Sequence, residues 1–174
     1  MIRWRAIFGF LGLFAVWLQA HAQSASYHTS GNVEVAVTDF GSLGAVRERA
    51  VAPNFEFPKS GGRYYLHGRS EIWVGDADGN VANTWGWDAT DQQWFFDEWK
   101  PTVEGMYTGG IESDGRQTII AQYASSCNTD FPLNLLVKQQ SFSWRASDAP
   151  SAEDFIAIKL TVTNNGDADH DGIY

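Results

Sequence analysis

The stretch DFIAIKLTVT, residues 154–163, decides the fold because apolar and polar residues alternate along it. One parity holds Ile156, Ile158, Leu160 and Val162, and the other holds Lys159, Thr161 and Thr163. Successive side chains of a β-strand point to opposite faces of the sheet. The pattern therefore predicts a strand whose aliphatic row faces a core and whose lysine and threonine row faces solvent.

A second and longer strand is predicted by FPLNLLVKQQSFSWRAS at residues 131–147. Its apolar residues change parity along the segment: Leu133, Leu135 and Val137 have one parity, and Phe142 and Trp144 have the other. A β-bulge near Gln139 or Gln140 would bring both groups to the same face.

The rest of the chain also favours strands. NVEVAVTDF at residues 32–40 alternates valines with Glu34 and Ala36, which predicts a half-buried strand. Residues 84–107 contain four tryptophans and Pro101 without a helical stripe, so we expect a long loop or short irregular elements packed over a sheet. With 17 glycines, short β-branched and aromatic runs, and turn signals between them, the chain is predicted to be all-β. The regular architecture at this size is an antiparallel β-sandwich.

The N-terminus has the three parts of a secretory signal peptide. Arg3 and Arg5 precede an apolar run at residues 6–18, and Ala20-His21-Ala22 supplies a small-x-small cleavage site. The apolar run is shorter than the ~20 residues that a transmembrane helix needs. We expect residues 1–22 to be a cleaved signal peptide, residues 23–31 a disordered lead-in, and residues 32–174 the β-sandwich domain. The mature chain would be secreted or displayed at the cell surface, without membrane insertion.

The net charge limits the classes of partner, and the cysteine content limits the possible disulfides. Loss of the two arginines leaves ten basic residues against 21 acidic ones, a net charge of −11 for the mature chain. So acidic a chain repels nucleic acid, whereas cations and cell-surface components or glycans are compatible partners. The single cysteine, Cys127, cannot form an intramolecular disulfide, and we interpret it as a buried or incidental thiol.

The acidic end NNGDADHDGIY, residues 164–174, has two interpretations. Asp167, Asp169, Asp171 and Gly172 match positions 1, 3, 5 and 6 of a calcium-binding loop, whose bidentate carboxylate at position 12 would fall at residue 178. Alternatively, the segment is an acidic hairpin turn between the strand at 154–163 and a strand that begins with GIY. In either case we expect the sandwich to be incomplete at its C-terminus and the chain to be a fragment of a longer protein.

Two further groups of residues are candidate sites. GDADGN at residues 75–80 alternates Asp76, Asp78 and Asn80, but its glycine comes one position too early for the same calcium loop, and a hairpin connection fits better. A carbohydrate site could use Trp94 and Trp99 as stacking surfaces, with Asp97 and Glu98 accepting hydroxyl hydrogen bonds. Alternatively, these aromatic side chains pack in the core or anchor loops.

No catalytic motif is present in the sequence. The nucleophile elbow, the HExxH zinc motif, the phosphate-binding loop and paired CxxC motifs are all missing. The mature histidines, His28, His67 and His170, lack zinc-ligand spacing, and we expect each on the surface or in a turn. Asp97 and Glu98 are adjacent and so would point to opposite sides of an extended chain, which excludes them as a glycosidase pair.

Three stretches together resemble a known group of proteins: YYLHGRSEIWVG at 64–75, GMYTGGIESDGRQTIIAQY at 105–123, and DFPLNLLVKQQSFSWRAS followed by DFIAIKLTVTNNGD. They are similar to an N-terminal region of large, mostly uncharacterised secreted bacterial proteins that often carry C-terminal sorting or immunoglobulin-like modules. The resemblance implies scaffold roles for Trp73, Gly75, Phe142, Trp144 and Asn164, and no catalytic residue. It also implies that GIY continues into another strand.

These observations favour an exported, non-enzymatic β-sandwich module of a larger extracellular or cell-surface protein, with calcium as its candidate ligand. One alternative is a carbohydrate-binding module that uses exposed tryptophans. Another is the non-catalytic part of a secreted hydrolase.

Overall fold

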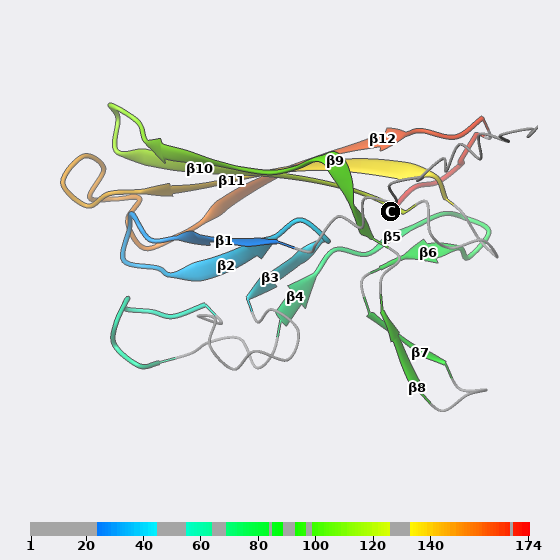
Figure 1. Cartoon of the computed structure of the whole chain (residues 1–174), viewed down its shortest axis with the longest axis horizontal. Helices are drawn as coiled ribbons and strands as arrows, with labels where there is room; N and C mark the ends of the chain where they lie inside the picture. The colour runs from blue at the N-terminus through cyan, green and yellow to red at the C-terminus, as the bar shows by residue number, and fades with distance from the viewer. Residues whose placement is uncertain are drawn as a thin grey trace, which may run out of the picture.

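A computed structural model describes residues 24–44, 55–63, 69–83, 85–88, 93–96, 99–125, 133–167 and 169–174, with backbone only at 69, 85–88 and 93–96. These residues form strands and no helix, so the predicted all-β class is confirmed (Figure 1). The strands are β1 (Ala25–His28), β2 (Val35–Thr38), β3 (Ser42–Gly44), β4 (Arg69–Glu71), β5 (Val74–Gly75), β6 (Val81–Ala82), β7 (Trp85–Asp88), β8 (Gln93–Phe96), β9 (Lys100–Ile111), β10 (Arg116–Ala124), β11 (Leu135–Trp144) and β12 (Ala157–Asn164). The expected signal peptide lies outside the described residues, which include no helix with the length and hydrophobicity of a membrane span.

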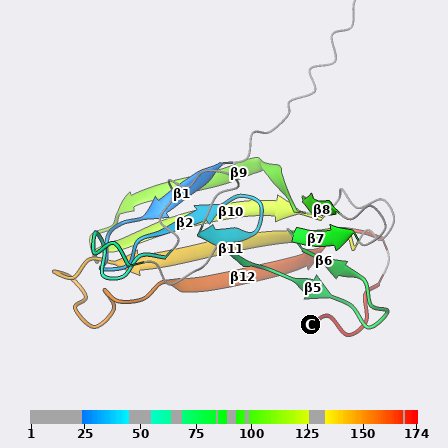
Figure 2. The same ribbon diagram turned by 90° about the horizontal axis from the view of Figure 1, so that it is seen from below.

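Every strand pair is antiparallel, and the largest sheet has the order β12-β11-β10-β9. A second four-stranded sheet, β1-β2-β3-β4, lies against one face of the first, and the β5-β6 and β7-β8 hairpins form two smaller sheets. Seen from below, β1 and β2 lie in front of β9 and β10, whereas β12 runs along the opposite edge (Figure 2).

The long strand β11 has no bulge, so that prediction was wrong. Its pairing with β10 runs without a register shift from Arg116↔Trp144 to Ala124↔Leu136. The inner face of β11 instead changes from apolar to polar, because Gln139, Ser141 and Ser143 are buried there. Phe142 and Trp144 therefore lie on the outer face. There Phe155 packs against Trp144, with ring centroids 5.4 Å apart, and Arg116 lies over Phe142.

The hydrophobic core occupies the end of the large sheet nearest β5 and β6. It contains Val74, Ala82, Trp99, Ala121, Tyr123, Leu133, Leu135 and Val137, with Ile72 and Met106 packed against it. At its centre the rings of Trp99 and Tyr123 meet edge to face, with centroids 5.3 Å apart. The irregular segment predicted for residues 84–107 is replaced by β7, β8 and the beginning of β9, since β9 pairs with β10 from Lys100 onward.

The N-terminal boundary also differs from the prediction. The expected disordered lead-in contains β1, which pairs with β2 from Ala25↔Thr38 to His28↔Val35 and buries His28. The predicted strand at β2 is confirmed, but it is covered on both faces rather than half-buried. Glu34, immediately before β2, forms an antiparallel backbone bridge with Glu56, and this bridge helps to cover the strand.

The apolar row of the final strand, β12, faces inward as predicted, but its side chains are not buried. Ile158, Leu160 and Val162 pair with Ser141, Gln139 and Val137, so they continue the inner row of β11. Their side chains nevertheless remain 42, 42 and 40% exposed. Burial fails because the smaller sheet covers the β9–β10 side of the large sheet and leaves the β12 edge largely open.

Candidate functional site

The first acidic segment, residues 75–80, forms the hairpin turn that the sequence predicted between β5 and β6. Asp76 organises this turn. Its Oδ1 accepts hydrogen bonds from the backbone N–H groups of Asp78 (3.0 Å) and Asn80 (2.9 Å), and its Oδ2 accepts one from Asn80 Nδ2 (2.8 Å). These bonds, with the Asn80 side chain first, hold the pKa of Asp76 below its usual range. The Asp76 carboxylate is therefore ionised at neutral pH. It is also almost completely buried.

The second acidic segment, which follows β12, returns to this same turn. Tyr174 and Gly75 exchange two backbone hydrogen bonds of 2.9 and 3.0 Å, and the Ala77 N–H donates to the Asp171 carbonyl at 3.2 Å. His170 Nδ1 lies 3.7 Å from Asp76 Oδ2. The GIY segment thus pairs with β5 and not with β12, so the predicted hairpin onto β12 was wrong.

Two glycines allow this close approach. A Cβ atom at Gly75 would come within 2.8 Å of the Tyr174 ring, and one at Gly172 within 3.2 Å of the Ala77 side chain. Gly172 also has a φ of 61°, a left-handed conformation that disfavours other residues. These contacts bring Asp171 to the turn that contains Asp76 and Asp78, and Asp167 and Asp169 precede it in the same C-terminal segment. We call the five aspartates of these two segments the acidic corner: Asp76, Asp78, Asp167, Asp169 and Asp171.

The predicted calcium ligands Asp167, Asp169 and Asp171 are exposed at this corner. Within the described ranges, no group of three or more histidine, cysteine, aspartate or glutamate side chains has the geometry to hold a metal ion. The corner fits calcium in its donor chemistry, because carboxylate oxygens and the positive φ of Gly172 are features of calcium loops. Calcium binding by these three residues stays a prediction.

The structure does not assemble the predicted carbohydrate site around Trp99. That indole is completely buried, and its Nε1–H donates to the Ile72 carbonyl at 3.0 Å. No face of the ring is therefore available to a sugar, which corrects the expectation for Trp99. The backbone of Trp94 lies in β8 opposite Trp87, but its side chain, like Asp97 and Glu98, lies outside the described residues.

His28 was expected on the surface but lies in the interior between the two sheets. Its Nδ1 and Nε2 are each 2.8 Å from a serine hydroxyl, those of Ser143 and Ser141. Burial lowers the pKa of His28 to about 4, against a weaker opposing effect of its hydrogen bond with Gln117. A histidine beside two serines can suggest nucleophilic catalysis, but this imidazole is 0% exposed and cannot meet a substrate. Nothing in the sequence of β1 or β11 indicated that His28 would contact these two serines.

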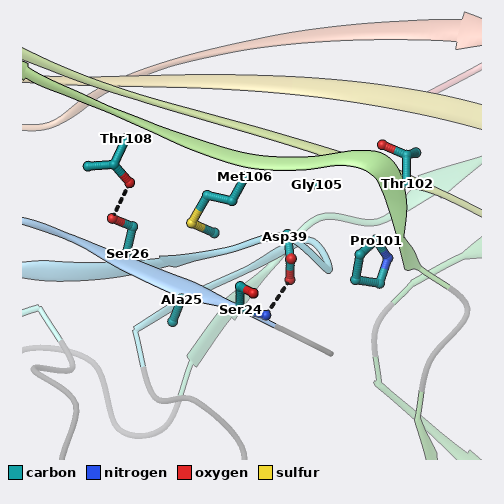
Figure 3. Close-up of a pocket in the computed structure, with 9 residues that line it drawn as sticks. All are labelled: Ser24, Ala25, Ser26, Asp39, Pro101, Thr102, Gly105, Met106 and Thr108. Atoms are coloured by element: carbon teal, nitrogen blue, oxygen red, sulfur yellow. Dashed lines mark hydrogen bonds between the residues drawn. The ribbon is translucent and has the colours of Figure 1, made fainter. Parts of the chain in front are cut away.

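A shallow pocket of about 310 Å³ lies where the start of β1 meets β9 (Figure 3). Asp39 Oδ1 accepts a 2.8 Å hydrogen bond from the Ser24 N–H, and the hydroxyls of Ser26 and Thr108 lie 2.5 Å apart. The Ser26–Thr108 contact links β1 of the smaller sheet to β9, whereas the Ser24–Asp39 bond holds the start of β1 against the end of β2. We interpret the pocket as part of the boundary between the two sheets, which the sequence did not indicate.

The remaining predicted residues add no further site. Cys127 and His67 lie outside the described residues. No known protein family matches the chain, and neither a curated protein nor a solved structure gives a significant match. The resemblance to secreted bacterial proteins therefore stays a prediction.

Proposed function

We propose that this chain is an exported, non-enzymatic β-sandwich module of a larger extracellular or cell-surface protein, and that calcium stabilises its acidic corner. The observation that carries the proposal is the meeting of two acidic turns that are distant in sequence, through the Ala77–Asp171 and Gly75–Tyr174 hydrogen bonds. The signal-peptide pattern supports export.

Contacts between the two four-stranded sheets support the sandwich. His28 on β1 reaches Ser141 and Ser143 on β11, and Gln117 on β10 donates from Nε2 to the Tyr27 carbonyl at 3.0 Å. Buried polar groups bonded across an interface fix the position of one sheet on the other. These side chains hold the two sheets together, which agrees with a scaffold role.

Charge supports calcium as the ligand. Two acidic segments that meet repel one another, and in a mature chain of net charge −11 few cationic side chains are available to offset their charge. A divalent cation with a preference for oxygen ligands would reduce this repulsion and tie the C-terminal segment to the β5–β6 turn. Removing calcium would then loosen residues 165–174 without unfolding the sheets.

The test is the melting temperature of the mature chain, beginning at residue 23, in millimolar calcium and in excess chelator. At a calcium concentration about tenfold above Kd, binding stabilises a protein by about 1.4 kcal/mol, which corresponds to roughly 3–6 °C for a chain of this size. Asp169→Asn should reduce this increase. Glu104→Gln is the matched control because it removes one exposed carboxylate from β9, a strand outside both acidic segments. An equal melting temperature with and without calcium would reject calcium stabilisation.

A further inference from the structure

One edge of the large sheet is an unpaired strand with an unusual combination of features. β12 pairs with β11 through eight consecutive residue pairs, from Leu135↔Asn164 to Phe142↔Ala157, without a register shift. Among the described strands, none pairs with its other edge. Half of its backbone N–H and C=O groups therefore point outward along a regular edge, which is a template for another strand.

The inner side of this edge is apolar and hollow. Besides its three half-exposed aliphatic residues, β12 is preceded by Ile156, which with Ile158 lines an open pocket of about 170 Å³. Val35, Leu43, Phe55 and Ser70 of the smaller sheet and the segment beside it form the opposite wall. The mostly apolar lining of this space suits an aliphatic side chain. A strand added to β12 would place alternate side chains over this pocket because side chains alternate between the two faces.

The opposite edge of the same sheet is protected, which makes β12 distinctive. β9 contains Pro101, which has no N–H to donate, and its pairing with β10 is interrupted by two register shifts. Prolines and bulges are the usual means by which proteins prevent edge-to-edge pairing. β12 has neither, and its only charged residue, Lys159, lies on the outer face.

The charges at the two ends of β12 indicate what kind of strand fits. Glu153 and Asp154 stand just before the strand, and Asp167 and Asp169 follow it. An antiparallel second copy of β12 would bring the acidic end of one strand against the acidic end of the other, at both ends of the pairing. Like charges in apposition disfavour that complex, whereas a strand with basic ends is attracted in either direction.

We propose that β12 is a docking edge for an extended segment of a partner protein that has alternating apolar residues and basic residues at its ends. The segment adds as a fifth strand, buries Ile158, Leu160 and Val162, and places an aliphatic side chain in the pocket. This is recognition by β-strand addition, in which backbone hydrogen bonds give affinity and the pocket gives specificity. It goes beyond the proposed scaffold function: calcium at Asp167 and Asp169 would offset part of the charge at one end, but the backbone edge and the pocket do not involve those residues.

The experiment measures binding of fluorescent synthetic peptides to the mature chain by anisotropy. The probe alternates valine or leucine with threonine and has two lysines at each end. One comparison peptide has glutamates in place of the lysines, and another is N-methylated at alternate backbone nitrogens. We expect the lysine-flanked peptide to bind and each change to weaken its binding at least about tenfold.

Two variants of the chain complete the test. Leu160→Lys places a charge on the inner side of the edge and should weaken peptide binding at least about tenfold, whereas Val103→Lys, an exposed apolar position on β9, should leave it within about twofold. The N-methylated peptide tests the unaltered chain, so the result stands even if Leu160→Lys does not fold. Failure of the lysine-flanked peptide to bind, or equal binding of the N-methylated peptide, would overturn the proposal. So would self-association of the chain that Leu160→Lys abolishes, because the occupant would then be a second copy.

Discussion

Mild acid should destabilise this protein through the single buried histidine of β1. His28 is completely buried between Ser141 and Ser143, and its pKa is about 4 in the folded chain against 6.5 for the exposed side chain. As the pH falls below 6.5, the unfolded chain takes up a proton at this position and the folded chain does not. Stability is therefore full above that pH and is lost as the pH falls toward 4.

The size of the effect follows from the two pKa values. Each unit of pKa difference corresponds to 1.36 kcal/mol, so the full loss is about 3 kcal/mol. Between about pH 7.5 and about pH 5 the loss is about 2 kcal/mol, a large part of the 5–15 kcal/mol that a typical domain has.

The assay is urea unfolding at several pH values, for the natural chain and for His28→Asn. Asparagine retains a polar side chain but does not titrate, and protonation of all other groups cancels when the two pH dependences are subtracted. We expect the natural chain to lose about 2 kcal/mol more than the variant over this interval. A second measurement, the NMR shift of the His28 ring protons, should stay constant from about pH 7.5 to about pH 5. Parallel pH dependences, or a His28 ring that titrates near 6.5, would refute the buried position of this residue.

Two further predictions concern packing. Trp99→Ala should lower the free energy of unfolding by about 3–5 kcal/mol, because it empties the centre of the core, whereas Trp73→Ala at a 63% exposed position should cost under about 1 kcal/mol in the same urea titrations. Gly75→Ala should displace the Tyr174 ring and speed amide hydrogen exchange in residues 170–174, while Gly110→Ala, where a Cβ meets nothing within 4 Å, should not. Equal costs for the two tryptophans, or unchanged exchange in Gly75→Ala, would contradict the respective packing.

Alternation in the sequence was sufficient to predict the all-β class and the strands β2, β11 and β12. It failed where burial depends on a neighbour that the sequence does not reveal. The apolar row of β12 faces inward, but the smaller sheet approaches it only across an open pocket beside Ile158 and leaves the row 40–42% exposed. The supposed bulge in β11 came from the assumption that Phe142 and Trp144 must be in the core, whereas Ser141 and Ser143 are buried in their place to bond His28.

The candidate site was predictable in its parts and not in its assembly. Both acidic segments stood out by their aspartate and glycine spacing, and the β5–β6 hairpin is confirmed, whereas the hairpin predicted after β12 was wrong. Their meeting through Asp171 and Ala77 is a tertiary contact that local spacing cannot indicate. The opposite error occurred at Trp99, where an aromatic residue beside carboxylates suggested a binding surface although the side chain fills the core.

The most direct test of the central claim is a calcium titration of the isotopically labelled mature chain, followed through its backbone amide NMR signals. Calcium at the acidic corner predicts saturable shifts confined to residues 75–80 and 165–174, with the signals of β10 and β11 unchanged. The Ala77 amide, which donates to the Asp171 carbonyl, should be among the most strongly affected. Signals that stay constant at millimolar calcium, or shifts centred elsewhere in the chain, would contradict it.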